Sequence, residues 1–125
     1  MQKKTLAIII PCYNEANRLP IENYKSFFNK THDVSIFFIN DGSIDETANV
    51  IQEMGIEFSE QFNLISLEKN RGKGNAVLEG FNFVLNNHDF KKIAFLDADL
   101  STSLEECCRL ANYVEGKISL VFGSR

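Results

Sequence analysis

The sequence has no tryptophan, only two prolines and only three cysteines. Cys107 and Cys108 are adjacent and Cys12 is distant, so the chain has no C-x-x-C pair. This excludes a disulfide framework and a cysteine-bound zinc site, and it fits a reducing compartment. We interpret Cys107 and Cys108 as small residues on the buried side of a helix.

An excess of basic charge and long apolar runs are also absent. The formal net charge is −4 with no basic stripe, so the composition does not favour a nucleic-acid partner. The apolar run from Leu6 stops at Pro11, too early for a signal peptide, and no run reaches the roughly 20 apolar residues of a membrane span. We therefore expect a cytoplasmic protein, with residues 1–125 forming a single domain.

Apolar runs typical of buried strands alternate with stretches of helical periodicity. Strands are predicted at 6–10, 34–39, 62–67, 92–96 and 118–122. Short loops between alternating strands and helices predict right-handed βαβ units. The predicted fold is therefore α/β, with a mostly parallel sheet covered by helices on both faces.

Four helices are predicted between these strands. They start at Pro20, at a Ser43–Glu46 pair, near Ala76 and at a Ser103–Glu106 pair, and the second and fourth end at Gly55 and Gly116. Each Ser–Glu pair has the spacing of a capping box. The periodicity places Ile44 on the buried face of the second helix and Leu85 on that of the third.

Polar residues collect where four of the predicted strands end. The loops after these strands hold Glu15, Asp41, Lys73 and the Asp97/Asp99 pair. In parallel α/β sheets the carboxyl ends of the strands share one edge, and ligands bind beyond it. We expect these residues to form one site.

The Asp97-Ala98-Asp99 segment ends an apolar strand. Residues two apart in extended backbone point the same way, so a turn here can direct both carboxylates at one point. Such a pair suits Mg²⁺ or Mn²⁺, usually together with substrate phosphates. On spacing alone, a solvated turn with an Asp helix cap remains an alternative. An EF-hand loop is excluded because Thr102 and Cys108 occupy its glycine and glutamate positions.

The NRGKG loop at 70–74 also leads from a strand into a helix. A P-loop would need Ser or Thr where Gly74 stands, and a dinucleotide fingerprint would need glycine at Val77. The loop is either a surface hairpin or a phosphate-facing loop that uses backbone N–H groups together with Arg71 and Lys73. Tyr13 is similarly either packing or a platform for a base, and Asp41 is either a helix cap or a ligand.

Four motifs, in order, resemble those of family 2 glycosyltransferases: PCYNE at 11–15, NDGSIDET at 40–47, NRGKG at 70–74 and DAD at 97–99. The RGKG loop and the DADLST segment at 97–102 make the chain most similar to dolichyl-phosphate or polyprenyl-phosphate glucosyl- and mannosyltransferases. The resemblance spans nearly the whole chain. It implies the GT-A fold, a Rossmann-like nucleotide-diphospho-sugar transferase sheet.

The resemblance also implies roles for single residues. The nucleotide-binding positions would be Pro11, Tyr13, Glu15, Ile39, Asp41, Lys73, Asp97 and Ala98. Asp41 would hold the base or ribose, and Lys73 would approach the donor. Asp97 and Asp99 would bind the Mg²⁺ or Mn²⁺ that bridges the diphosphate, and Arg125 would face the acceptor phosphate. Asp97, Asp99 and Arg125 would be the catalytic residues.

The implied activity is inverting, metal-dependent transfer of a hexose from a UDP- or GDP-linked donor to a dolichyl or polyprenyl phosphate. Transfer to a glycan or polysaccharide hydroxyl is an alternative, and a nucleotide-binding module without turnover is a non-enzymatic one. Family catalytic domains continue past the position of Arg125. We therefore expect the chain to be the N-terminal, C-terminally truncated part of such a domain, inactive on its own. Association with the cytoplasmic face of a membrane, and a role in cell-envelope glycan synthesis, would depend on the part that follows.

Overall fold

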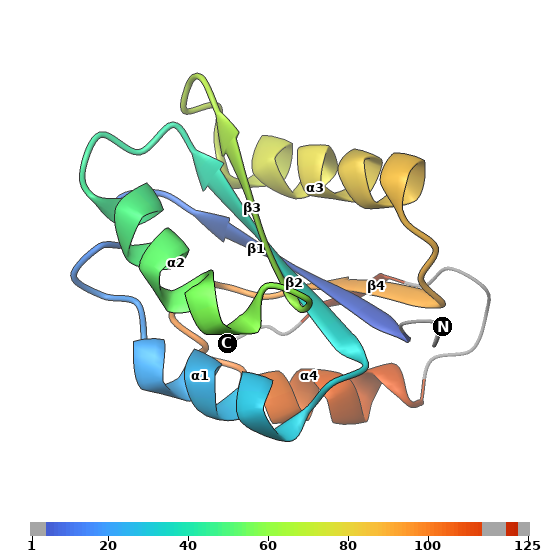
Figure 1. The fold of residues 1–125 in the computed structure, drawn as a ribbon. Helices are drawn as coiled ribbons and strands as arrows, with labels where there is room; N and C mark the ends of the chain where they lie inside the picture. Colours follow the sequence, from blue (N-terminus) through green and yellow to red (C-terminus); the bar gives the residue numbers. More distant parts are fainter. Residues whose placement is uncertain (1–4, 114–119, 123–125) are drawn as a thin grey trace.

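The computed structural model describes residues 5–113 and 120–122. Strands and helices alternate along the chain (Figure 1): β1 (Leu6–Cys12), α1 (Ile21–Lys30), β2 (Val34–Asp41), α2 (Thr47–Gly55), the short 3-10 helix η1 (Ile56–Phe58), β3 (Phe62–Leu67), α3 (Lys73–Asn87), β4 (Lys92–Phe95), α4 (Leu104–Ala111) and β5 (Leu120–Phe122). All strand pairs are parallel, in the order β3-β2-β1-β4-β5. The predicted α/β fold with a parallel sheet is confirmed.

The central strand β1 is buried on both faces of the sheet. Leu6, Ile8 and Ile10 belong to the core shared with α1, α2 and α4, whereas Ala7 and Ile9 belong to the core under α3. Figure 1 shows the same division, with α3 covering one face and the other helices lying on the opposite one. A continuous apolar run is the pattern that a strand covered on both faces requires.

The helix α3 approaches the sheet closely at Gly80. A Cβ atom at this position would lie 2.7 Å from Cγ2 of Ile9 and 3.2 Å from Cγ1 of Ile39. The missing side chain therefore lets the helix backbone lie directly on β1 and β2. This contact places the N-terminal end of α3, with Lys73, above the carboxyl edge of the sheet.

The strand β1 is longer than predicted and continues through Pro11 to Cys12. The Ile9 carbonyl accepts a hydrogen bond from Leu96 N at 3.0 Å, so odd-numbered residues of β1 direct their backbone groups toward β4. The β1–β4 pairing ends at Ile9 and Phe95, and beyond this point no sheet partner needs an N–H from Pro11. The predicted break at Pro11 is therefore wrong.

The predicted capping box at the start of α2 is also wrong. The helix begins at Thr47, whose N–H donates to Oδ1 of Asp45 at 2.9 Å, and the Ser43 hydroxyl accepts from Asn14 N instead. Ile44 consequently lies outside the helix and is 86% exposed.

The two later helices follow the predictions more closely. The Ser103 hydroxyl accepts from Glu106 N–H at 3.0 Å and caps α4 as predicted, although the Glu106 carboxylate pairs with Arg109. The predicted end of that helix at Gly116 lies outside the described residues. On α3, Leu85 is 48% exposed, contrary to prediction, because the buried stripe follows Ala76, Gly80 and Val84 at four-residue spacing.

Candidate functional site

The direction of the chain across the sheet reverses between β1 and β4. The first three strands lie in the order β3-β2-β1, and the chain then returns to place β4 on the other side of β1. In open α/β sheets ligands bind beyond the carboxyl ends of the strands at this point. The loop after β1, with Glu15, and the turn after β4, with Asp97 and Asp99, flank it.

The turn after β4 holds both carboxylates. The Asp97 carbonyl accepts from Leu100 N at 3.0 Å, and Oδ1 of Asp99 accepts from Ser101 N at 3.0 Å. Leu100 has a φ of 56°, which lets the backbone reverse so sharply. Asp97 is half-buried and Asp99 is exposed, so one carboxylate lines the edge of the sheet and the other faces solvent beside it.

Lys73, the first residue of α3, reaches across to this turn. Its Nζ forms a hydrogen-bonded ion pair with Oδ1 of Asp97. The loop after β3 and the turn after β4 are therefore brought together, as predicted. The Lys73 side chain is 56% exposed, which leaves its ammonium group accessible to an anionic ligand.

Asp41 ends β2 and holds the loop that precedes Lys73. Its Oδ2 accepts from Asn70 Nδ2 and from Gly72 N, both at 3.0 Å, and its Oδ1 accepts from Arg71 N at 3.1 Å. Asp41 is only 2% exposed. Its carboxylate therefore serves the loop at 70–72 and does not cap α2.

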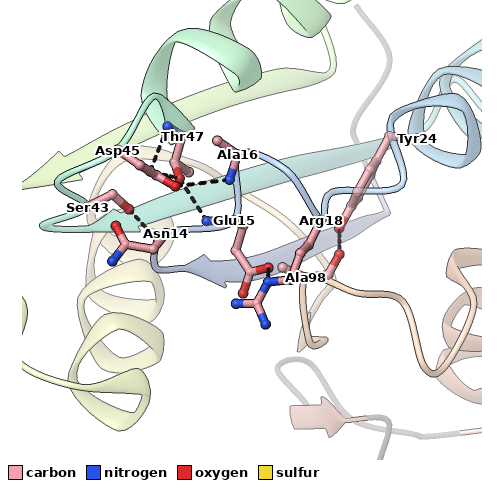
Figure 2. A network of polar contacts seen from close by, with 9 residues as sticks. All are labelled: Asn14, Glu15, Ala16, Arg18, Tyr24, Ser43, Asp45, Thr47 and Ala98. Carbon is pink, nitrogen blue, oxygen red and sulfur yellow. Dashed lines mark hydrogen bonds and ion pairs between the residues drawn. The ribbon is translucent and has the colours of Figure 1, made fainter.

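A second network ties the loop after β1 to the loop after β2 (Figure 2). Asn14 N donates to the Ser43 hydroxyl at 2.9 Å, and Glu15 N donates to Oγ1 of Thr47 at 2.8 Å. The Thr47 hydroxyl donates in turn to Asp45. Asn14 has a φ of 52°, a conformation that asparagine tolerates better than most residues. These hydrogen bonds fix the backbone at Glu15.

The Glu15 side chain lies near the other carboxylates of the site. Burial raises the pKa of its carboxyl, the Arg18 guanidinium at 3.3 Å lowers it, and the carboxylates of Asp99, Asp45 and Asp97 raise it further. The net direction is upward. A cluster of acidic groups at a strand edge, with a lysine beside it, is suited to a cation and a phosphate together.

The comparison with known families identifies this arrangement. The model of glycosyl transferase family 2 matches residues 7–125. The chain belongs to this family. It is 30% identical over 122 residues to the polyprenol monophosphomannose synthase of Mycolicibacterium smegmatis, which covers 94% of this chain and 44% of that protein. It is 33% identical over 116 residues to the dolichyl-phosphate beta-glucosyltransferase of Mus musculus, covering 86% and 35% respectively. The resemblance inferred from the four motifs is confirmed.

A solved structure supports the same fold. The mannosyltransferase PcManGT from Pyrobaculum calidifontis, in complex with GDP-Man and Mn²⁺, matches 79% of this chain and 28% of its own chain, with a TM-score of 0.59 and 18% identity. The predicted GT-A fold is confirmed. The chain spans between 30% and 44% of the length of the first curated relatives that it matches.

The other predicted nucleotide-binding positions differ in their exposure to solvent. Tyr13 is 41% exposed at the edge of the sheet, whereas Pro11 is buried, Ile39 is fully buried in the core under α3, and Ala98 is 4% exposed. The Ile39 side chain therefore does not line the surface of the site. Arg125 lies outside the described residues.

The sequence did not identify the residues whose hydrogen bonds fix the loops and the turn of the site. These are Asn14, Ser43, Asp45, Thr47, Asn70 and, as described below, Tyr24. All of them except Tyr24 lie within the motifs at 11–15, 40–47 and 70–74, and Thr47 is the first residue of α2. Apart from the Asp45–Thr47 pair, their partners lie 29 to 32 residues away, or 74 for Tyr24, and no local spacing shows such pairings.

The carboxylate pair also fits the metal that the family implies. Asp97 and Asp99 offer hard oxygen ligands on one turn, which suit Mg²⁺ or Mn²⁺. Across residues 5–113 and 120–122, no three His, Cys, Asp or Glu side chains are grouped so that they could hold a metal by themselves. Donor phosphates and water are the ligands that usually complete such a two-carboxylate site. Within the same part of the chain, no helix combines the length and apolarity needed to cross a membrane.

Proposed function

We propose that this chain forms the donor-binding part of a glycosyltransferase that moves a hexose from a UDP- or GDP-linked donor to a polyprenyl or dolichyl phosphate. The observation that carries the proposal is the meeting of Asp97, Asp99, Lys73 and Glu15 at one edge of the sheet. Relatives named for polyprenol- and dolichyl-phosphate transfer support the acceptor class.

The nucleotide would lie over the carboxyl ends of β1 and β2. The exposed Tyr13 ring offers a surface on which a base can stack, and Glu15 offers a carboxylate for ribose or base. Pro11 and Ile39 would shape the floor beneath the base from their buried positions. Asp41 would act on the nucleotide through the loop at 70–72, because its carboxylate already accepts three hydrogen bonds there.

The diphosphate would lie between Lys73 and the Asp97/Asp99 turn. Mg²⁺ or Mn²⁺ held by the two aspartates would supply Lewis-acid neutralisation of the diphosphate charge. Lys73 would turn from Asp97 to a phosphate oxygen, as its exposed side chain allows. The Asp99 carboxylate accepts from Ser101 N and the Asp97 backbone carbonyl accepts from Leu100 N, so the turn is held ready before the donor arrives.

The transfer itself follows from the chemistry of a phosphate acceptor. An acceptor oxygen attacks the anomeric carbon, a new C–O bond forms, and the bond to the nucleoside diphosphate breaks on the opposite face, which inverts the anomeric configuration. A phosphate monoester has a second pKa of about 6, so at pH 7 its nucleophilic oxygen needs no general base. Arg125 is assigned to the acceptor phosphate by the family resemblance alone.

Isothermal titration calorimetry tests the donor half of the proposal. We expect UDP or GDP to bind more tightly with Mn²⁺ than with a chelator, and we expect Asp99→Asn to remove that difference while leaving weak binding. Asp33→Asn, at the opposite edge of the sheet, is the matched control. Equal affinity with and without metal in the wild-type chain would contradict the metal assignment.

A labelled-donor assay tests the acceptor. The full-length protein is incubated with radiolabelled UDP- or GDP-hexose and vesicles containing polyprenyl phosphate, polyprenol or a glycan. We expect label in the polyprenyl phosphate only, with the inverted anomer. Label in the glycan would instead indicate a hydroxyl acceptor, and nucleotide binding without any transfer would indicate a binding module.

A further inference from the structure

The side chain of Tyr24 connects α1 to the turn that carries the two aspartates. Its hydroxyl donates a hydrogen bond to the Ala98 carbonyl at 2.9 Å, across 74 positions of the sequence. Tyr24 is 0% exposed and Ala98 is 4% exposed, so the bond is shielded from water. Figure 2 shows the Tyr24 side chain extending from the helix to the Ala98 carbonyl of the turn.

The ring of Tyr24 is fixed by packing. It meets Phe38 of β2 edge-on, with ring centroids 5.1 Å apart and an interplanar angle of 65°. Phe38 is fully buried in the same core. The hydroxyl therefore stands at a defined place, because neither ring can move without disturbing the core.

The bond acts on the peptide group that joins Ala98 to Asp99. That group is planar, so holding the Ala98 carbonyl also holds the Asp99 N–H and limits rotation about the bonds on either side. The other hydrogen bonds described for the turn anchor it through Leu100 N and Ser101 N. Tyr24 holds the middle of the turn, between the two carboxylates.

We propose that Tyr24 is a positioning residue that sets the direction of the Asp99 carboxylate toward the metal-bound diphosphate. The inference rests on the proposed function, in which Asp97 and Asp99 bind the metal. Partners that orient the ligands of a metal commonly change its affinity by about 10–100-fold when they are removed. Tyr24 does not touch the donor and acts through the Ala98–Asp99 peptide alone.

The phenol stays a donor over the working pH range. Burial raises the pKa of Tyr24 well above its ordinary value, and the nearby Cys12, Glu15 and Asp99 raise it further. The hydroxyl is thus protonated, and able to donate to Ala98, at neutral pH.

The test is Tyr24→Phe, which removes one oxygen and keeps the ring against Phe38. Calorimetry measures UDP and GDP affinity with Mn²⁺ and with a chelator, and circular dichroism measures the urea midpoint. We expect the metal-free affinity to stay within about twofold and the Mn²⁺-dependent gain to fall about 10–100-fold. Tyr113→Phe, at an exposed tyrosine, is the matched control and should behave as wild type.

A second variant separates positioning from general weakening of α1. Phe28 is also fully buried on α1 but stacks on Phe58, with ring centroids 4.9 Å apart, away from the turn. Phe28→Leu should lower the urea midpoint and keep the Mn²⁺-dependent gain. Loss of the gain in both variants would overturn the inference, because the effect would then follow stability.

The remaining outcomes are also decisive. If Tyr24→Phe keeps the Mn²⁺-dependent gain in nucleotide affinity that the wild-type chain shows, this inference is overturned and the proposed function stands. If the wild-type chain shows no such gain, both are overturned. If Tyr24→Phe does not fold, the ¹³Cζ resonance of Tyr24, which reports the hydroxyl hydrogen bond and lies away from the donor, is followed in the wild-type chain. A shift on addition of Mg²⁺ and nucleotide supports the coupling, and an unchanged resonance overturns it.

Discussion

Replacing Asp41 by asparagine tests the interpretation that this carboxylate holds the loop before Lys73. Asn keeps the shape of the side chain but turns one acceptor oxygen into an NH₂ group. The better orientation keeps an oxygen at the Oδ2 position, which accepts from Asn70 and Gly72, and sets the NH₂ against Arg71 N–H. Two donors then face each other at a residue that is 2% exposed.

The expected cost follows from these three hydrogen bonds. Leaving the Arg71 N–H without an acceptor costs about 1–3 kcal/mol, and each of the two retained bonds loses about 1 kcal/mol with the charge. Since the loop at 70–72 is partly exposed and can relax, we expect a total of about 2–4 kcal/mol. A domain of this size has about 5–15 kcal/mol of stability, so the variant should still fold.

Urea denaturation followed by far-UV circular dichroism measures this cost, because the chain has no tryptophan for fluorescence. Asp33→Asn is the matched control, since Asp33 directly precedes β2, is exposed, and accepts from the Thr5 hydroxyl at 3.0 Å. We expect the control to change stability by less than about 0.5 kcal/mol. An Asp41→Asn midpoint equal to that of wild type or of the control would refute the reasoning.

Three further predictions concern the charge, the lysine and the packing of α3. Because burial, foremost, raises the Glu15 pKa, the ionised carboxylate destabilises the native state above that pKa, and the penalty disappears as the pH falls to the ordinary glutamate range. Glu15→Gln should therefore raise the urea midpoint at neutral pH but not at acidic pH, and an effect of equal size at both would be inconsistent with the shift. Lys73→Ala should change stability by less than about 1 kcal/mol, since the ion pair is exposed, yet weaken UDP or GDP binding about tenfold without affecting uridine or guanosine in calorimetry. Gly80→Ala should lower the thermal midpoint, because overpacking against the sheet costs about 1–3 kcal/mol. A Cβ atom at Gly74 would meet nothing within 4 Å, so Gly74→Ala should leave the midpoint equal or higher. The reverse order of the two midpoints would show that α3 lies elsewhere.

The fold could be predicted because its signals are local. Each buried strand appears as an apolar run, and the caps and glycines between strands mark the loops. The failures also have local causes. Pro11 continues β1 because β4 has already ended, which depends on the length of another strand. Ile44 lies outside α2 because Asp45, rather than Ser43, takes the first helical N–H.

The site could be predicted only in part. Strand ends gave the edge at which Glu15, Lys73, Asp97 and Asp99 meet, and the structure brings them together there. The sequence does not show which carboxylate accepts hydrogen bonds from the protein's own loops and which is left to bind a ligand. The family resemblance implies that Asp41 holds base or ribose, whereas its carboxylate binds the loop at 70–72 through a contact between segments about 30 residues apart.

The most direct test of the central claim is paramagnetic broadening of amide signals by Mn²⁺ with UDP or GDP. The 14.2 kDa chain is small enough for residue-by-residue assignment by nuclear magnetic resonance. The site predicts strong broadening at Glu15, Asp99 and Ser101, and much weaker broadening at Thr5 and Val34 on the opposite edge of the sheet. Asp97→Asn with Asp99→Asn should abolish it. Broadening centred on Thr5 and Val34, or broadening that survives in the double variant, would contradict the account.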